Sequence, residues 1–208
     1  MSDEATQHAG NGRADALEVF IRTPRLEDRA EFLAIRARDR AWLMPWEPLP
    51  AKPGVDLFTP GEFEKYVADS TSERRVRFFI CVRESGSANA HDEHGVIAGQ
   101  ASLSEIIRGP LQQAFLGYWV AQPFAGRGVM SRGLRLVLAE AFGTLGLHRV
   151  EANIQPHNAR SIALVRRLGF RLEGYSPQYL QIQGAWADHE RWALRADEFE
   201  AAAGSSRA

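Results

Sequence analysis

Two glycines flank a single arginine at residues 126–128, where a run rich in apolar residues gives way to one with helical spacing. Over residues 127–145 apolar side chains recur every three or four positions, which predicts an amphipathic helix. The first N–H groups of a helix have no partner within it and point into the preceding loop, with the positive end of the helix dipole. Because glycine has no Cβ, an anion can approach these amides closely. The segment predicts an anion-binding loop, or else a tight strand-to-helix turn whose backbone angles require glycine.

Two common phosphate-binding motifs do not fit this segment. A P-loop needs a lysine and a hydroxyl residue after its last glycine, and neither follows Gly128. In the dinucleotide fingerprint GxGxxG, Ser131 takes the place of the third glycine, although Glu151 lies at about the distance expected of a ribose-binding acid. That fingerprint usually opens a repeated parallel βαβ array, whereas several strand patterns precede these glycines without helices between them. The sequence therefore argues against a dinucleotide site.

Hydrophobic periodicity divides the rest of the chain into strands and helices. Strand patterns begin at Leu17 and cover 75–84, 95–106, 112–120, 147–155, 169–174 and 186–194, and helical patterns cover 25–43, 60–73 and 158–168. Consecutive strands joined by turns predict an antiparallel meander, to which the second half adds a βαβ unit. We expect an α/β fold with a mixed, mostly antiparallel central sheet and helices on both faces. One domain is expected over residues 16–202, with 1–15 and 203–208 as disordered tails.

Charge and cysteine content limit the classes of partner and compartment. A formal net charge of −1 gives no overall attraction to nucleic acid or to an anionic membrane, and the tryptophans are too dispersed for a base-stacking platform. The single cysteine, Cys81, cannot form an intrachain disulfide, and its apolar surroundings favour an inert buried thiol. No apolar run approaches about 18 residues, and the first residues lack the apolar segment of a secretory signal. We therefore expect a cytoplasmic protein.

The segment "HDEH", residues 91–94, offers two imidazoles and two carboxylates that could bind a metal ion. It lies in a polar loop without distant partner ligands, which favours a solvated loop over a metal site. We therefore expect no metal.

Three motifs, in this order, resemble the GNAT acetyltransferases. "AGRGVM" resembles the family's pyrophosphate loop, [Q/R]xxGx[G/A], and "HNARSIALVRRLGF" resembles its second signature, an asparagine-led helix ending in LGF. More narrowly, "GYWVAQPFAGRGVM", "HRVEANIQPHNARS" and "LGFRLEGYSPQYLQIQGAWADHERWAL" resemble the ribosomal-protein alanine N-acetyltransferases, the RimJ branch. The resemblance covers residues 101–194 and extends more weakly from Leu17. Ala125 and Met130 depart from the loop consensus, but in this family the pyrophosphate is bound mainly by backbone N–H groups.

The resemblance implies acetyl-CoA as cosubstrate and a GNAT fold whose sheet is splayed at its central strands. Tyr118, Trp119 and Val120 would lie on the splayed strand and pair with the pantetheine arm. The pyrophosphate would be held by the loop, which consists of Gly126, Arg127, Gly128, Val129, Met130 and Ser131. Asn158 matches the family asparagine near the pantetheine arm. It also fits a helix N-cap, a role worth about 1 kcal/mol.

The departing thiolate needs a proton. Many GNAT enzymes supply it from a tyrosine five residues before the phenylalanine of LGF, where this chain has Val165. In the RimJ branch the natural candidate is the serine three residues after the asparagine, Ser161. Ser161 fits a helix-start hydrogen-bonding residue equally well, and water is the remaining proton source.

The acceptor amine must be neutral before it attacks. An α-amino group has a pKa of about 7.7–8.0 and needs no powerful base, whereas a lysine ε-amine, at about 10.4, needs more help. Glu105, near the end of a central strand, is the candidate base, directly or through water. It fits a solvated strand-end carboxylate as well. His157 and Tyr179 are weaker candidates.

The acceptor side is expected to be built from aromatic residues. Trp46, with Trp42, is expected to line the mouth of the site, and Tyr175 and Tyr179 to shape the acceptor cleft. The resemblance favours the N-terminal α-amine of a protein, such as a ribosomal protein, as acceptor. Two alternatives remain: a small amine such as an antibiotic or polyamine, and a non-catalytic module that binds acetyl-CoA. Monomer and homodimer are both open, and no nucleic acid or membrane partner is expected.

Overall fold

The structure is a computed structural model that describes residues 17–48, 59–84 and 94–205. Within them the strands are β1 (Leu17–Arg22), β2 (Thr71–Ser72), β3 (Arg75–Glu84), β4 (Val96–Ile107), β5 (Gln113–Val120), β6 (Arg149–Ile154), β7 (Arg171–Ile182) and β8 (Ala185–Arg195). The α-helices are α1 (Arg29–Arg38), α2 (Arg40–Leu43), α3 (Pro60–Ala68), α4 (Val129–Phe142), α5 (Ala159–Arg167) and α6 (Ala196–Ser205). Three 3₁₀ turns are η1 (Leu26–Asp28), η2 (Met44–Trp46) and η3 (Gln122–Phe124). No helix in these residues is long and apolar enough to cross a membrane.

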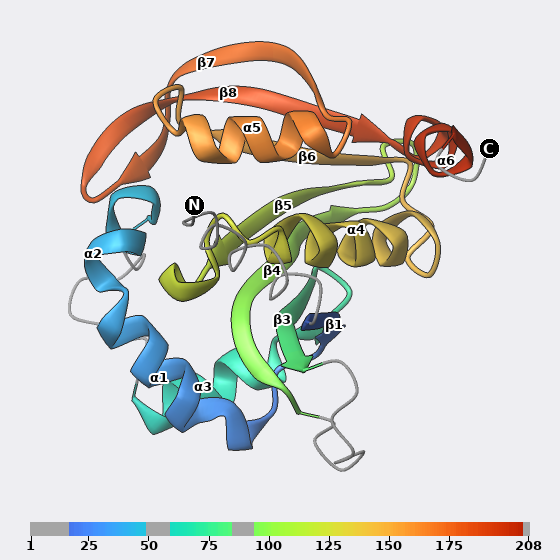
Figure 1. Ribbon diagram of the computed structural model, residues 1–208. Helices are drawn as coiled ribbons and strands as arrows, with labels where there is room; N and C mark the ends of the chain where they lie inside the picture. The colour runs from blue at the N-terminus through green and yellow to red at the C-terminus, as the bar shows by residue number, and fades with distance from the viewer. Residues whose placement is uncertain (1–16, 49–58, 85–93, 206–208) are drawn as a thin grey trace, which may run out of the picture.

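The described strands form one mixed sheet in the order β1-β3-β4-β5-β6-β8-β7, with β2 paired to β3. Neighbouring strands are antiparallel except β5 and β6, which are parallel and joined through α4. This confirms the expected meander over β3 to β5 and the added βαβ unit. The predicted α/β fold with a mostly antiparallel sheet is therefore confirmed (Figure 1).

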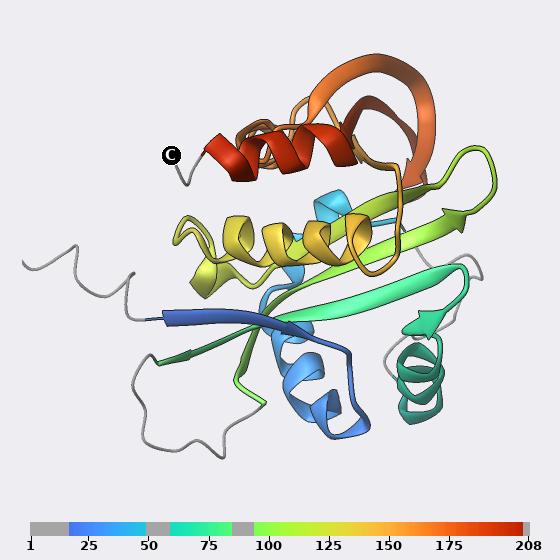
Figure 2. The ribbon, with the colours of Figure 1, turned by 90° about the vertical axis from the view of Figure 1, so that its right-hand side faces the viewer.

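Alternation along β3 explains why helices cover both faces of the sheet. Phe78, Ile80 and Val82 join the core under α4, whereas Phe79 and Cys81 join a second core under α1 and α3. Successive side chains of a strand point to opposite faces, so each face of β3 has its own apolar layer. Figure 2 shows α4 on one side of β1 and β3 and α1 on the other. Cys81 is buried as expected, and burial raises the pKa of its thiol to about 12.

Helix boundaries differ from the sequence expectation where the backbone breaks. The segment 25–43 is divided at Asp39, between α1 and α2, and α4 covers 129–142 instead of 127–145. Gly128 precedes α4 with a φ of +74°, which no residue of a right-handed helix adopts. At the other end of the chain, α6 extends to Ser205 and so includes three residues expected to lie in a tail.

The sheet opens between β5 and β6. Their pairing covers only residues 113–115 of β5 and 149–151 of β6. Figure 1 shows the two strands side by side near α6 and apart at their other ends, with α4 and α5 flanking the opening. The part of β5 that contains Tyr118, Trp119 and Val120 therefore has no partner strand on that side among the described residues, as the predicted splay requires.

Candidate active site

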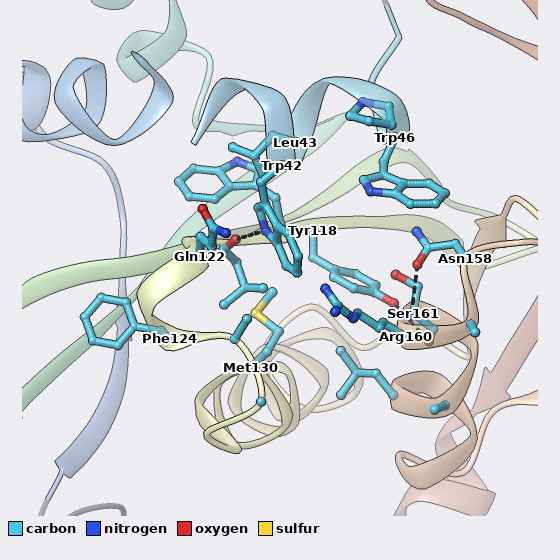
Figure 3. A pocket seen from close by; sticks show the side chains of 18 of the residues that line it. Trp42, Leu43, Trp46, Tyr118, Gln122, Phe124, Met130, Asn158, Arg160 and Ser161 are labelled. Carbon is cyan, nitrogen blue, oxygen red and sulfur yellow. Dashed lines mark hydrogen bonds between the residues drawn. The ribbon is translucent and has the colours of Figure 1, made fainter. Parts of the chain in front are cut away.

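A pocket of about 1010 Å³ occupies the opening between β5 and α5 and extends to α2 and η2. Its lining includes Tyr118, Trp119 and Val120 from β5, and Gly126, Gly128, Met130 and Ser131 from the glycine loop and the start of α4. Asn158 and Ser161 line it from α5, and Trp42 and Trp46 from the α2–η2 segment. Figure 3 shows the labelled side chains among them, which come from β5, α4, α5 and the α2–η2 segment, around one space. The fold thus brings together most of the residues that the sequence singled out.

The glycine loop presents open backbone amides to the pocket. Gly126 and Gly128 both have a φ of +74°, and a Cβ built on either would meet nothing within 4 Å. The first hydrogen bond of α4 is donated by the Arg132 N–H to Gly128 O, so the amides before Arg132 lie at the unpaired end of the helix. Glycine therefore permits the turn and leaves space in front of the amides, an arrangement compatible with both expected roles.

Two residues of the predicted loop contribute differently from their neighbours. The Val129 side chain is completely buried in the core beneath α4, so only its backbone faces the loop. The Arg127 side chain is exposed, and its guanidinium carbon lies 5.7 Å from the centre of the Phe124 ring. Neither belongs to the described pocket lining, and the anion-binding capacity of the loop rests on its amides.

The end of β5 directs backbone groups into the opening. Ala121 N–H donates to Ala98 O on the β4 side, and pairing direction alternates along a strand. Tyr118 and Val120 therefore turn their backbone groups away from β4. The Val120 carbonyl accepts a hydrogen bond of 3.0 Å from Trp42 Nε1, which leaves the Val120 N–H and both backbone groups of Tyr118 for a ligand. An extended chain in the opening can pair with them as an additional strand does.

Tyr118 and the start of α5 meet across the pocket. Asn158 is the N-cap of α5, because its Oδ1 accepts a hydrogen bond of 3.1 Å from Ser161 N, which confirms the predicted cap. The Tyr118 hydroxyl donates to the backbone carbonyl of Ser161, with 3.4 Å between the oxygens (Figure 3). Burial raises the pKa of Tyr118 to about 12, so the phenol stays protonated at neutral pH. Two hydroxyl groups, those of Tyr118 and Ser161, thus lie at the same wall. Val165 is fully buried in the core, away from this role.

The charged side chains of the pocket were not identified from the sequence. Arg160 and Arg167 line it from α5, and Glu47, just after η2, is the single carboxylate among its described lining residues. The guanidinium of Arg160 lies over the Trp42 ring, 4.6 Å from its centre. Helical spacing could have placed the arginines at the pocket. Positions 160 and 167 are seven residues apart and share a helix face with Ser161 and Leu164. No local signal marks Glu47.

Comparison with known proteins identifies the family. Residues 18–171 match the sequence profile of the acetyltransferase (GNAT) domain. The chain belongs to the GNAT acetyltransferase family. A [ribosomal protein uS5]-alanine N-acetyltransferase of Escherichia coli K12 is 34% identical over 163 residues, which are 76% of this chain and 77% of that protein. The chain is accordingly an N-acetyltransferase.

Two further relatives agree with this family. The structure of Mycobacterium smegmatis RimJ in complex with CoA-disulfide has a TM-score of 0.73 and 30% sequence identity, and the match covers 89% of each chain. YjcK of Bacillus subtilis, named a probable N-acetyltransferase, is 41% identical over 98 residues, 47% of this chain. That match spans 54% of YjcK, about half of its length.

Glu105 lies outside the pocket of this GNAT enzyme. It sits at an irregularity of β4, with a φ of +47°, and its carboxylate accepts a hydrogen bond from Arg74. Half of its side chain is exposed, and its surroundings are Asp69, Ser72 and two arginines. The structure thus does not bring Glu105 to Ser161. Its position fits the alternative expectation, a solvated carboxylate at the end of a strand.

The aromatic residues expected on the acceptor side divide into two groups. Trp46 lines the pocket, and its ring lies 5.2 Å from that of His157, which lines it as well. Tyr175 and Tyr179 lie on β7, outside the described lining. Tyr175 donates a hydrogen bond to Asp188, and the Tyr179 ring lies 6.0 Å from that of His189. β7 extends beyond the expected 169–174, and both tyrosines lie on its hairpin with β8.

The described part of the chain contains no group of three or more His, Cys, Asp or Glu side chains that could hold a metal ion. Of the "HDEH" segment, residues 91–93 lie outside the described residues.

Proposed function

We propose that this enzyme transfers the acetyl group of acetyl-CoA to the N-terminal α-amine of a protein, such as a ribosomal protein. The observation that carries the proposal is one pocket that joins the glycine-loop amides, the unpaired end of β5 and the Ser161 hydroxyl. The named relatives, an alanine N-acetyltransferase of ribosomal protein uS5 and RimJ with CoA-disulfide, support the same donor and acceptor.

The donor half of the pocket fits acetyl-CoA in charge and shape. The amides of Gly126 and of residues 128–131 and the guanidiniums of Arg160 and Arg167 suit the phosphates, because backbone N–H groups and arginine forks bind phosphate oxygens. Tyr118 and Val120 offer backbone donors and an acceptor to the amide-bearing pantetheine arm. The volume of about 1010 Å³ reaches the upper end of the range usual for small-molecule sites, as a ligand of this size requires.

Acetyl-CoA, when bound, supplies a thioester that an amine can attack directly. The β5 backbone would orient the thioester, and Asn158 would hold the first turn of α5 so that Ser161 stays at the wall of the pocket. Ser161 would donate its hydroxyl proton to the departing sulfur and regain one, through water, from the ammonium formed when the amine attacks. The Tyr118 phenol, which stays protonated, lies beside it. Trp42 and Trp46 would exclude water from the reacting atoms.

The acceptor half favours an α-amine over a polyamine. A polyamine carries several positive charges, whereas the described lining offers a single carboxylate, Glu47, to pair with them. Ammonium groups left without a partner oppose binding of such a ligand. An α-amine brings one positive charge and is already partly neutral near pH 7.5.

Two measurements test the proposal. Acetyl-CoA at 100 times its dissociation constant is expected to stabilise the protein by about 2.7 kcal/mol, seen as a raised melting temperature. Ribosomal proteins incubated with enzyme and acetyl-CoA are then expected to carry acetyl groups on N-terminal α-amines, mapped by mass spectrometry. Acetylation of ε-amines alone would overturn the acceptor assignment. Stabilisation by acetyl-CoA with no acetylated product would support the non-catalytic module.

A further inference from the structure

We infer that Glu47 binds the amino group of the acceptor and that Arg36 holds its carboxylate in place for this contact. The inference rests on the proposed function, since it names the residue that recognises the amine. Glu47 is the single acidic side chain among the described residues that line the pocket, and 27% of its side chain is exposed. A carboxylate so placed is the expected partner of a primary ammonium.

Arg36 fixes the carboxylate without using all of its acceptor capacity. Arg36 Nη1 donates to one Glu47 oxygen and Nη2 to the other, both at 2.5 Å. A carboxylate has about four lone-pair sites, so a two-pronged arginine leaves sites free on both oxygens. The guanidinium carbon of Arg36 lies 5.6 Å from the centre of the Trp119 ring, which also lines the pocket. Arg36 is therefore a positioning residue.

The backbone beside Glu47 is held by two distant elements. Gln155, directly after β6, donates a side-chain hydrogen bond of 3.3 Å to Pro45 O, and Gln183, in the β7–β8 turn, donates one of 3.0 Å to Glu47 O. Two separate parts of the chain thus hold the backbone at Glu47, and Arg36 on α1 holds its carboxylate. Such convergence on an exposed loop residue is typical of a preorganised binding group.

The surroundings of Glu47 fit one positive charge next to apolar groups. Trp42, Trp46 and Trp119 line the same pocket and cover apolar substituents. Arg160 already lies over the Trp42 ring and Arg36 over the Trp119 ring, so Trp46 is the ring of the three that remains to attract the ammonium. The site therefore selects a single ammonium on a small apolar residue, such as the α-amine of an N-terminal alanine.

The test compares two synthetic peptides, one with an N-terminal alanine and one with propionyl in place of that alanine, so that only the amine is missing. Both are titrated into CoA-saturated protein at pH 7. The wild type is expected to bind the amine peptide about 10- to 100-fold more tightly, the discrimination that a charge-assisted hydrogen bond provides. Glu47→Gln is expected to bind the two peptides equally and to keep the wild-type affinity for CoA. Retained discrimination in this variant would overturn the inference.

Two further variants separate amine recognition from folding. Arg36→Glu combined with Glu47→Arg restores an ion pair but removes the carboxylate from position 47, so it is expected to fold and to lose the discrimination. Glu18→Gln is the matched control, because Glu18 forms the same two-pronged pair with Arg83 on β1 and β3, away from the pocket. It is expected to behave as the wild type does.

The proposed function is judged by wild-type turnover with acetyl-CoA. If the wild type acetylates no peptide or protein N-terminus, the proposed function fails and the inference fails with it. If the wild type acetylates the alanine peptide and Glu47→Gln has an unchanged KM for it, only the inference fails.

Discussion

The carboxylate of Asp39 accepts a hydrogen bond from the backbone N–H of Gln122, with 2.8 Å between the two atoms. Asp39 is almost completely buried at the junction of α1 and α2, and Gln122 is the first residue of η3, which leads into the glycine loop. Trp42, one turn further along, bonds the Val120 carbonyl at the end of β5. The α1–α2 junction therefore holds the β5 end of the connection that leads into the glycine loop.

Replacing Asp39 with alanine is expected to lower stability and cofactor affinity together. The variant leaves the Gln122 N–H without its partner, which costs about 1–3 kcal/mol of unfolding free energy and releases the start of the loop. Chemical denaturation and titration with CoA measure the two effects. Arg38→Gln removes only the half-exposed partner of Asp39 and is expected to cost less than about 1 kcal/mol. Lower stability with unchanged CoA affinity would limit Asp39 to a structural role.

Asp39 also predicts how stability changes in acid. Hydrogen bonds from the Arg38 side chain, with that from Gln122, hold the pKa of Asp39 below its ordinary value. At pH values between the folded pKa and about 3.9 the unfolded chain binds more protons, so this stabilisation is complete above about pH 4–5 and is lost as the pH falls through the folded pKa. The free energy of unfolding of Asp39→Asn is therefore expected to fall less steeply below pH 4 than that of the wild type. Parallel curves would contradict this assignment.

Gly128→Asp is expected to abolish cofactor binding. The substitution places a carboxylate in front of the loop amides and forces a non-glycine residue to a φ of +74°, a strain of about 1–2 kcal/mol. Gly146→Asp is a matched control, because Gly146 has a φ of +57°, similar open space and a position outside the pocket lining. Both variants are expected to melt lower, and only Gly128→Asp to lose CoA binding in calorimetric titration. Equal CoA affinity in the two folded variants would remove the loop from the donor site.

Ser161→Ala tests the source of the proton for the thiolate. A hydroxyl that acts only as sulfur leaves stabilises the transition state, so its loss is expected to lower kcat about 10²-fold and to spare the KM for acetyl-CoA. Tyr118→Phe is the comparison, since its hydroxyl lies at the same wall and contacts only the Ser161 backbone among the described residues. Steady-state kinetics of both variants show which of the two hydroxyl groups donates the proton. A full rate in Ser161→Ala with a lower rate in Tyr118→Phe would make the phenol the proton donor. Full rates in both variants would leave water as the proton source.

Elements with strong local signals were predictable from the sequence. The strand pattern over residues 75–84 predicted β3, and Asn158 before an apolar helix predicted the N-cap that the structure contains. Helix boundaries that depend on backbone conformation were harder to predict from the sequence. Nothing in the sequence shows that α4 begins only after Gly128, or that Asp39 divides one helical pattern by bonding a residue 83 positions away.

The two acidic candidates show where sequence reasoning about the site ends. Glu105 lies near the end of a central strand pattern, but an irregularity in β4 turns it toward Arg74 and solvent. Glu47 lies in a proline-rich segment without periodicity, and its position depends on Arg36, Gln155 and Gln183. Contacts over 11 to 136 positions cannot be inferred from a local pattern.

Three residue pairs, ending at Phe115 and Glu151, are the only strand pairing described between the part of the sheet formed by β1 to β5 and the part formed by β6, β7 and β8. In mechanical terms this short parallel seam is the weakest line across the molecule, and the proposed donor site lies along its unjoined length. A chain bound against Tyr118 and Val120 would lengthen the seam with backbone hydrogen bonds of its own. Cofactor occupancy would then set the stiffness of the whole sheet, and the acceptor would meet a more rigid scaffold after the donor has bound.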